Sequence, residues 1–169
     1  MMNQINNQIL SQVQSEQKIR RISYQILESN FEEEEIFIAG IDGTGYAFAE
    51  LLTQALSSIT SKDIKLVKIS IDKKNPIDSQ IIIDEKVESM KGKVLIVADD
   101  VLNSGKTLLH SLKPFLEIPL KKIEIAVLVN RSHTRFPVAP AYSGLELSTT
   151  MSEHIEVEIK DGKAVAYLH

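Results

Sequence analysis

The residues best suited to chemistry form one short tract that follows an apolar run. Asp99 and Asp100 come directly after the apolar residues 94–98 and precede a small polar loop. At the carboxyl end of a buried parallel strand, side chains leave the sheet at the edge where α/β folds bind ligands. Adjacent carboxylates can accept hydrogen bonds from vicinal sugar hydroxyls and can offer oxygen ligands to Mg²⁺, directly or through water. The tract therefore predicts a site for a sugar and a magnesium ion.

The loop that follows the acids has the composition of an anion-binding loop. It consists of Asn103, Ser104, Gly105, Lys106 and Thr107, and a helix is expected to begin within it. Backbone N–H groups at a helix N-terminus bind phosphate, and hydroxyl side chains add donors. The alternative interpretation is an ordinary strand-end cap followed by a tight turn. The glycine spacing of a P-loop ATPase is absent because position 100 is Asp, so a sugar phosphate is the ligand that suits both halves of the tract.

Composition indicates a single globular domain. The 169 residues are 43% hydrophobic and 25% charged, which is sufficient for one core, and we expect one domain over residues 1–169. Because the chain has no cysteine, disulfides, thiolate nucleophiles and cysteine-bound zinc are excluded. The apolar runs are too short to cross a membrane and the first residues lack a signal pattern, so a cytoplasmic location is expected. A net charge of -4 argues weakly against nucleic-acid binding.

The hydrophobic pattern predicts alternating strands and helices. Helical spacing of apolar residues is found over residues 15–30, 48–59 and 106–116. Strands are expected over residues 36–39, 64–71, 81–87, 94–98 and 123–129, with a mobile loop over residues 72–80. A C-terminal β-hairpin is expected to turn at Asp161 and Gly162. The order strand-helix-strand indicates parallel crossovers, so the expected fold class is α/β, with a mostly parallel central sheet flanked by helices.

Two sets of residues resemble a known family. The tract from Asp99 to Thr107 is similar to the ribose-phosphate signature of type I phosphoribosyltransferases, in which a strand precedes two acids and a Thr/Ser-Gly-Lys/Arg-Thr loop. Farther along the chain, the resemblance narrows to the pyrimidine operon regulator and uracil phosphoribosyltransferase family. It rests there on residues 126–133, Phe136-Pro137, Tyr142, Gly144, Thr149 and Ser152-Glu153.

The resemblance implies a fold with a small hood and two ligands, 5-phosphoribosyl 1-diphosphate (PRPP) and Mg²⁺. Asp99 and Asp100 would be the catalytic pair, holding the ribose hydroxyls and the metal, and residues 103–107 would hold the 5-phosphate. Val129 and Arg131 fall in the family's base-binding segment. Purine-type relatives carry an acid at the position of Asn103, and an amide cannot take its place as a proton acceptor. A homodimer or tetramer is also implied.

The segment expected to bind diphosphate departs from the family pattern. Asp42, Gly43, Thr44 and Gly45 stand where the family commonly has Lys and Arg before a final glycine. Backbone amides can still cradle an anion there, but Asp42 adds a negative charge. Lys73 and Lys74 are the nearby cations, and they either close over the leaving group or are merely solvated. The histidines show no metal-ligand spacing.

The leading hypothesis is transfer of a phosphoribosyl group from PRPP to uracil, giving UMP and diphosphate. The alternative is a catalytically weak, nucleotide-sensing regulator of pyrimidine genes that binds RNA and acts in transcription attenuation. Two basic clusters are either parts of an RNA surface or solvated faces. They comprise Arg131, His133 and Arg135, and Lys18, Arg20 and Arg21. A different nucleobase handled by the same fold is a third interpretation.

Overall fold

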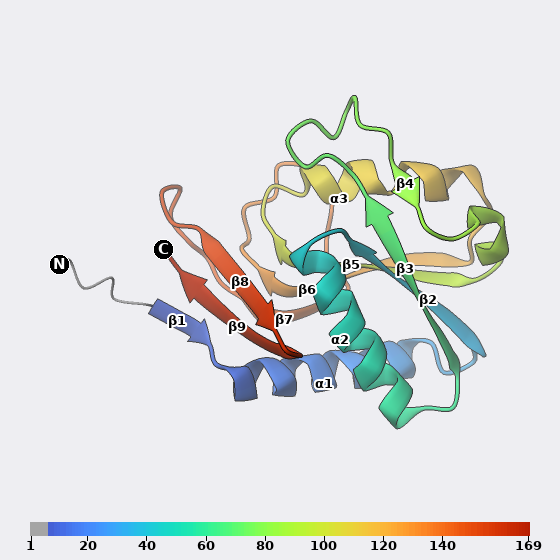
Figure 1. Cartoon of the computed structure of the whole chain (residues 1–169), viewed down its shortest axis with the longest axis horizontal. Helices are drawn as coiled ribbons and strands as arrows, with labels where there is room; N and C mark the ends of the chain where they lie inside the picture. Colours follow the sequence, from blue (N-terminus) through green and yellow to red (C-terminus); the bar gives the residue numbers. More distant parts are fainter. Residues whose placement is uncertain (1–6) are drawn as a thin grey trace.

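A computed structural model of the chain describes residues 7–169. The first residues, for which no signal pattern was expected, lie outside the described residues. The central sheet has six strands in the order β4-β3-β2-β5-β6-β7 (Figure 1). All neighbours are parallel except β3 and β4. The strands are β2 (Glu35–Ile41), β3 (Asp63–Ser70), β4 (Ile82–Ile83), β5 (Val94–Leu102), β6 (Lys122–Asn130) and β7 (Tyr142–Glu146).

Helices cover both faces of this sheet. Helices α1 (Gln12–Ser29) and α2 (Thr44–Ile59) pack on one face, and α3 (Lys106–Ser111) with the 3₁₀ turn η2 (Lys113–Glu117) packs on the other. Residues 94–98 of β5 form a continuous apolar run because both faces of the strand are covered: Ile96 contributes to one core, and Val97 to the opposite core. A strand covered on both faces has no solvent-facing positions, so its apolar and polar residues do not alternate. This confirms the expected α/β class.

A second, three-stranded sheet in the order β1-β9-β8 forms the hood. It comprises β1 (Asn7–Leu10), β8 (Ile155–Lys160) and β9 (Lys163–Leu168), and it lies beside α1 and α2 (Figure 1). Strands β8 and β9 are the expected hairpin. Asp161 has φ 52° and Gly162 has φ 74°, the left-handed pair that a two-residue hairpin turn requires.

Two expectations about local structure are wrong, and two strands are additional. The strand expected over residues 81–87 is limited to Ile82–Ile83, which pair at the sheet edge with Ile69 and Ser70, and the chain then turns into the 3₁₀ turn η1 (Val87–Met90). The helix expected over residues 106–116 ends at Ser111, because Pro114 follows and cannot donate a helical hydrogen bond. Strands β1 and β7 were not expected at all.

The helices among residues 7–169 include none that is both long and apolar enough to span a membrane.

Candidate functional site

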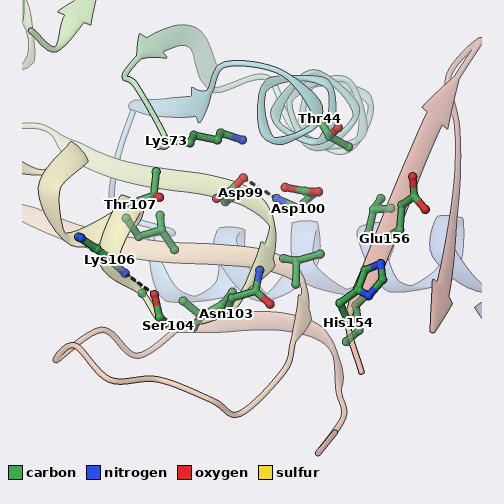
Figure 2. A pocket seen from close by; sticks show the side chains of 16 residues that line it. Thr44, Lys73, Asp99, Asp100, Asn103, Ser104, Lys106, Thr107, His154 and Glu156 are labelled. Atoms are coloured by element: carbon green, nitrogen blue, oxygen red, sulfur yellow. Dashed lines mark hydrogen bonds between the residues drawn. The ribbon is translucent and has the colours of Figure 1, made fainter. Parts of the chain in front are cut away.

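A cavity of about 540 Å³ opens beside the carboxyl end of β5 (Figure 2). Residues 99–108, which form the end of β5, the loop after it and the start of α3, make up most of its lining. Thr44 at the start of α2, Lys73 from the loop after β3, and residues 154–157 of the hood complete it. Four segments far apart in the sequence therefore meet around one space.

The two acids lie in this cavity with different exposure. Asp99 is only 7% exposed, whereas Asp100 is half-buried, so Asp99 is the inner acid of the pair. Asp99 Oδ1 accepts a hydrogen bond from the Asp100 N–H at 3.0 Å. Gly45 leaves room for this carboxylate, since a Cβ atom at that position would overlap Asp99 Oδ1. The junction between β2 and α2 therefore lies directly against the Asp99 carboxylate at the end of β5.

The electrostatics of the pair favour a cation. Burial, and then the neighbouring Asp100 carboxylate, raise the pKa of Asp99 well above its usual range, while the Lys73 ammonium acts in the opposite direction. No group of three or more His, Cys, Asp or Glu among residues 7–169 could hold a metal ion. Mg²⁺, however, is often held by one or two carboxylates together with ligand phosphates and water. The pair therefore fits a magnesium ion that arrives with a phosphorylated ligand.

All five residues of the expected phosphate loop, 103–107, line the cavity. The loop turns at Gly105, which has φ 85° and ψ 0°, and the Lys106 N–H donates to Ser104 Oγ at 3.3 Å. From behind, the Ser104 carbonyl accepts the N–H groups of Arg135 at 2.9 Å and Phe136 at 3.2 Å. Because α3 has only six residues, its dipole is small, and the loop's own N–H and hydroxyl groups must supply the anion contacts.

The expected diphosphate segment is only partly in the cavity. Thr44 lines it, whereas Asp42, Gly43 and Gly45 do not. Asp42 Oδ1 accepts the Gly43 N–H at 2.9 Å, so a carboxylate of the chain already occupies one of the amides that would cradle an anion. Lys73 lines the cavity, and its Nζ lies 4.0 Å from where a Cβ atom on Gly43 would be. The Lys73 ammonium, from the loop after β3, therefore lies near residues 42–45, a segment that contains no Lys or Arg.

The two residues expected in the base-binding segment, Val129 and Arg131, have different surroundings. The Val129 side chain is fully buried in the sheet core, so only its backbone can face a ligand. Arg131 lines a second cavity, of about 520 Å³, which shares Asn103 and Ser104 with the first. Its Nε donates to Thr149 Oγ1 at 2.6 Å, and its Nη2 donates to the carbonyls of Thr150, at 3.0 Å, and Glu153. The guanidinium thus holds the segment that leads into the hood.

Replacing Arg131 with Met is expected to loosen residues 149–153 and to lower the free energy of unfolding by about 1–2 kcal/mol, because hydrogen bonds from a charged donor are lost. Hydrogen-deuterium exchange of this segment measures the effect. Arg135→Met is the matched control, since Arg135 lines the same cavity but anchors the loop through its backbone N–H. Equal exchange in the two variants would contradict this role for Arg131.

Two polar side chains of the cavity, those of His154 and Glu156, were not expected from the sequence, and they project from the hood (Figure 2). They flank buried Ile155 in an alternating segment, so the sequence indicates only that they share one face of a strand. Their position over the acids depends on the path of residues 147–154, which no local pattern specifies.

Comparisons with known proteins agree with this geometry. A family profile described as "Phosphoribosyl transferase domain" matches residues 6–161. The bifunctional protein PyrR of Fusobacterium nucleatum is 36% identical over 86% of this chain and 87% of its own length, and that of Clostridium acetobutylicum is 32% identical over 90% and 89%.

The solved structures give the same fold. A hypoxanthine-guanine phosphoribosyltransferase from Bacillus anthracis has a TM-score of 0.76 and 20% identity, covering 97% of this chain and 99% of that chain. A hypoxanthine phosphoribosyltransferase from Trypanosoma cruzi has a TM-score of 0.74 and 12% identity, covering 95% of each chain. From the matched profile, the PyrR relatives and the cavity at the end of β5, we conclude that the chain belongs to the phosphoribosyl transferase domain family.

Proposed function

We propose that the chain acts as a single phosphoribosyltransferase domain that transfers the phosphoribosyl group of PRPP to uracil, giving UMP and diphosphate, with Mg²⁺ as the cofactor. The observation that carries the proposal is that paired carboxylates and a hydroxyl-rich loop line one cavity. Uracil is favoured over a purine because residues 126–133 and the motifs after them resemble the pyrimidine operon regulator and uracil phosphoribosyltransferase family. The two PyrR relatives match most of the chain at 32–36% identity. The hypoxanthine-type structures share the fold at 22% identity or less.

In this proposal, the chain works by positioning and electrostatics. The loop residues 103–107 hold the 5-phosphate, and Asp99 and Asp100 orient the ribose through its hydroxyls. Cleavage at the anomeric carbon develops positive charge on the ribose ring, which nearby carboxylates stabilise. When bound, Mg²⁺ neutralises charge on the diphosphate. The loop 72–80 and the hood exclude water from the sugar until the base attacks.

A second candidate function is a nucleotide-sensing regulator with weak turnover. The hydrogen bond from Gly43 N–H to Asp42 favours it, because a site that binds UMP does not need the diphosphate segment. In this form the protein would bind RNA through one of its basic clusters. Both candidates include a cytoplasmic homodimer or tetramer, as the family resemblance implies, and size-exclusion chromatography with light scattering measures that assembly.

The test is diphosphate release from PRPP with uracil, hypoxanthine, guanine and no base, with and without Mg²⁺, together with calorimetric titration of UMP. Release with uracil alone, dependent on Mg²⁺, supports the transferase. Reaction with a purine only would overturn the choice of base. Background release with tight UMP binding favours the regulator, and an RNA gel shift that weakens as salt rises supports its RNA-binding part.

Lys73 is expected to bind the leaving group in place of the cations missing from residues 42–45. Replacing Lys73 with Met should raise the KM for PRPP about tenfold, since one contact between an ammonium and a phosphate is lost. Steady-state kinetics with PRPP varied measures the change, and diphosphate should inhibit the variant less strongly than the wild type. Lys74→Met is the matched control, because Lys74 is next in sequence but does not line the cavity. If both variants behave alike, the lysines are only solvated.

A further inference from the structure

The proposed reaction requires a proton acceptor that the phosphate loop does not supply. Joining a nucleobase ring nitrogen to the ribose carbon releases the proton of that N–H group. Asn103 lies in the loop where an acid would be well placed, but an amide has no basic lone pair at neutral pH. Asp99 and Asp100 are assigned to the sugar and the metal. The acceptor must therefore come from another wall of the cavity.

The other titratable groups of the cavity leave one suitable candidate. They are Lys73, Lys106, His154 and Glu156. A protonated ammonium group has no free lone pair, so the two lysines cannot accept a proton. The Glu156 carboxylate is paired with His169, whose Nε2 is 3.1 Å from Glu156 Oε2. His154 remains, and imidazole is the side chain suited to proton transfer near neutral pH.

The structure also holds the His154 ring in place. His154 and His169 form a reciprocal pair of backbone hydrogen bonds, both 2.9 Å long, which extends the ladder between β8 and β9. Their rings stack with centroids 5.1 Å apart and an interplanar angle of 24°. The pairing of His169 with Glu156 fixes the outer ring of this stack. A catalytic group needs this kind of support, because its position must be set before the substrate arrives.

The placement of His154 is suited to a base bound beside the sugar. Figure 2 shows its ring projecting from the hood, opposite the side of the cavity that carries Asp100 and Asn103. A nucleobase attacking the ribose would lie between these two walls, since the acids hold the sugar and the loop holds its phosphate. The hood would then contact the base, and His154 is the ring of the hood that lines the cavity.

We propose that His154 is the general base of the transfer, accepting the ring N–H proton of the incoming nucleobase. The C1′–O bond to diphosphate breaks and the oxygen keeps its electron pair, while the base nitrogen forms the new bond to C1′. The nitrogen's proton passes to His154 and from there to water. This inference rests on the proposed function and adds the residue that makes a weakly acidic pyrimidine reactive.

The surrounding charges define the expected pH dependence. Within the hood, the His154 ring stacks on His169, which in turn contacts Glu156 and Tyr167, and Asp99, Asp100, Lys73 and Lys106 also line the cavity. The reaction requires the neutral form of the imidazole, so protonation of His154 should lower turnover.

The experiment measures kcat against pH for the wild type, His154→Gln and the control His110→Gln, with saturating PRPP and uracil. His110 lies on α3 outside the cavity, and His110→Gln should match the wild type. We expect His154→Gln to lower kcat about 100-fold or more and to lose the acid limb, while calorimetric UMP affinity stays within about twofold. Added imidazole should restore part of the activity of His154→Ala.

Each outcome has one meaning. If His154→Gln keeps more than half of the wild-type kcat, or retains the acid limb, the inference is overturned while the transferase proposal stands. If imidazole fails to raise the activity of a folded His154→Ala that binds UMP normally, a role as proton acceptor is likewise overturned. A wild type that releases no diphosphate with any base overturns the proposed function and the inference together.

Discussion

Replacing Asp99 with Asn is expected to stabilise the fold at neutral pH and to reduce phosphoribosyl transfer by about 100-fold or more. The side chain keeps its shape, and Oδ1 of Asn can still accept the Asp100 N–H. The negative charge is lost, however, and burial together with Asp100 makes that charge unfavourable in the folded protein. The Asp99 carboxylate, which the proposed sugar binding needs, therefore lowers the stability of the fold.

The sign of the pH dependence follows from the direction of the shift. Because folding raises the pKa of the Asp99 carboxyl, its contribution to stability is fully present below the unfolded carboxyl pKa, about 3.9, and is lost as pH rises through the folded pKa. The Asn variant and the wild type should have similar Tm values near that lower limit. Their Tm values should separate as pH rises, by about 2–4 °C for each kcal/mol gained.

Calorimetric melting between pH 4 and pH 8 measures this separation. Asp63→Asn is the control, since Asp63 is exposed and its ion pair with Lys65 spans 3.7 Å, so its removal should change stability by less than about 1 kcal/mol. An Asp99→Asn variant that melts below the wild type at every pH would contradict the prediction. It would mean that the ionised carboxylate is stabilised in the folded protein.

The sheet and the chemical tract could be predicted because local sequence specifies them. The first five residues of β5, 94–98, are all apolar, and the two acids at the end of the strand and the loop follow them without interruption. The Asp161-Gly162 turn also depends on two adjacent residues whose backbone preferences match the observed φ angles. For the core strands and this turn, the prediction from neighbouring residues was confirmed.

What could not be predicted depends on contacts distant in sequence. Strand β1 has only four residues, and it pairs with β9 at the other end of the chain. The burial of Asp99 depends on Gly45, which approaches from the neighbouring strand-helix unit. Lys73 and His154 reach the cavity from a loop and from the hood. Their sequence neighbourhoods indicate a solvated loop and an alternating strand, and neither pattern specifies what lies opposite.

Replacing Gly105 with Ala is expected to weaken UMP binding about 10- to 100-fold. Gly105 has φ 85°, a left-handed conformation that costs a residue with a Cβ atom about 1–3 kcal/mol. A Cβ atom at this position would also lie 3.2 Å from Val138 Cβ, so the loop must shift as well as strain. The N–H groups and the Ser104 hydroxyl would then no longer converge on the 5-phosphate. A displacement worth 1.4 kcal/mol in binding corresponds to about tenfold in affinity.

Gly92→Ala separates this effect from backbone strain alone. Gly92 has φ 74°, with nothing within 4 Å of the added Cβ atom, and it lies in the turn before β5, outside the cavity. Both variants should lose stability in thermal melts, because both place a Cβ atom in the left-handed region. Only Gly105→Ala should lose affinity in the UMP titration, because only that glycine shapes the phosphate loop. Equal UMP affinity in the two variants would show that residues 103–107 do not hold the phosphate, and the assignment of the cavity to a phosphorylated sugar would then have to be abandoned.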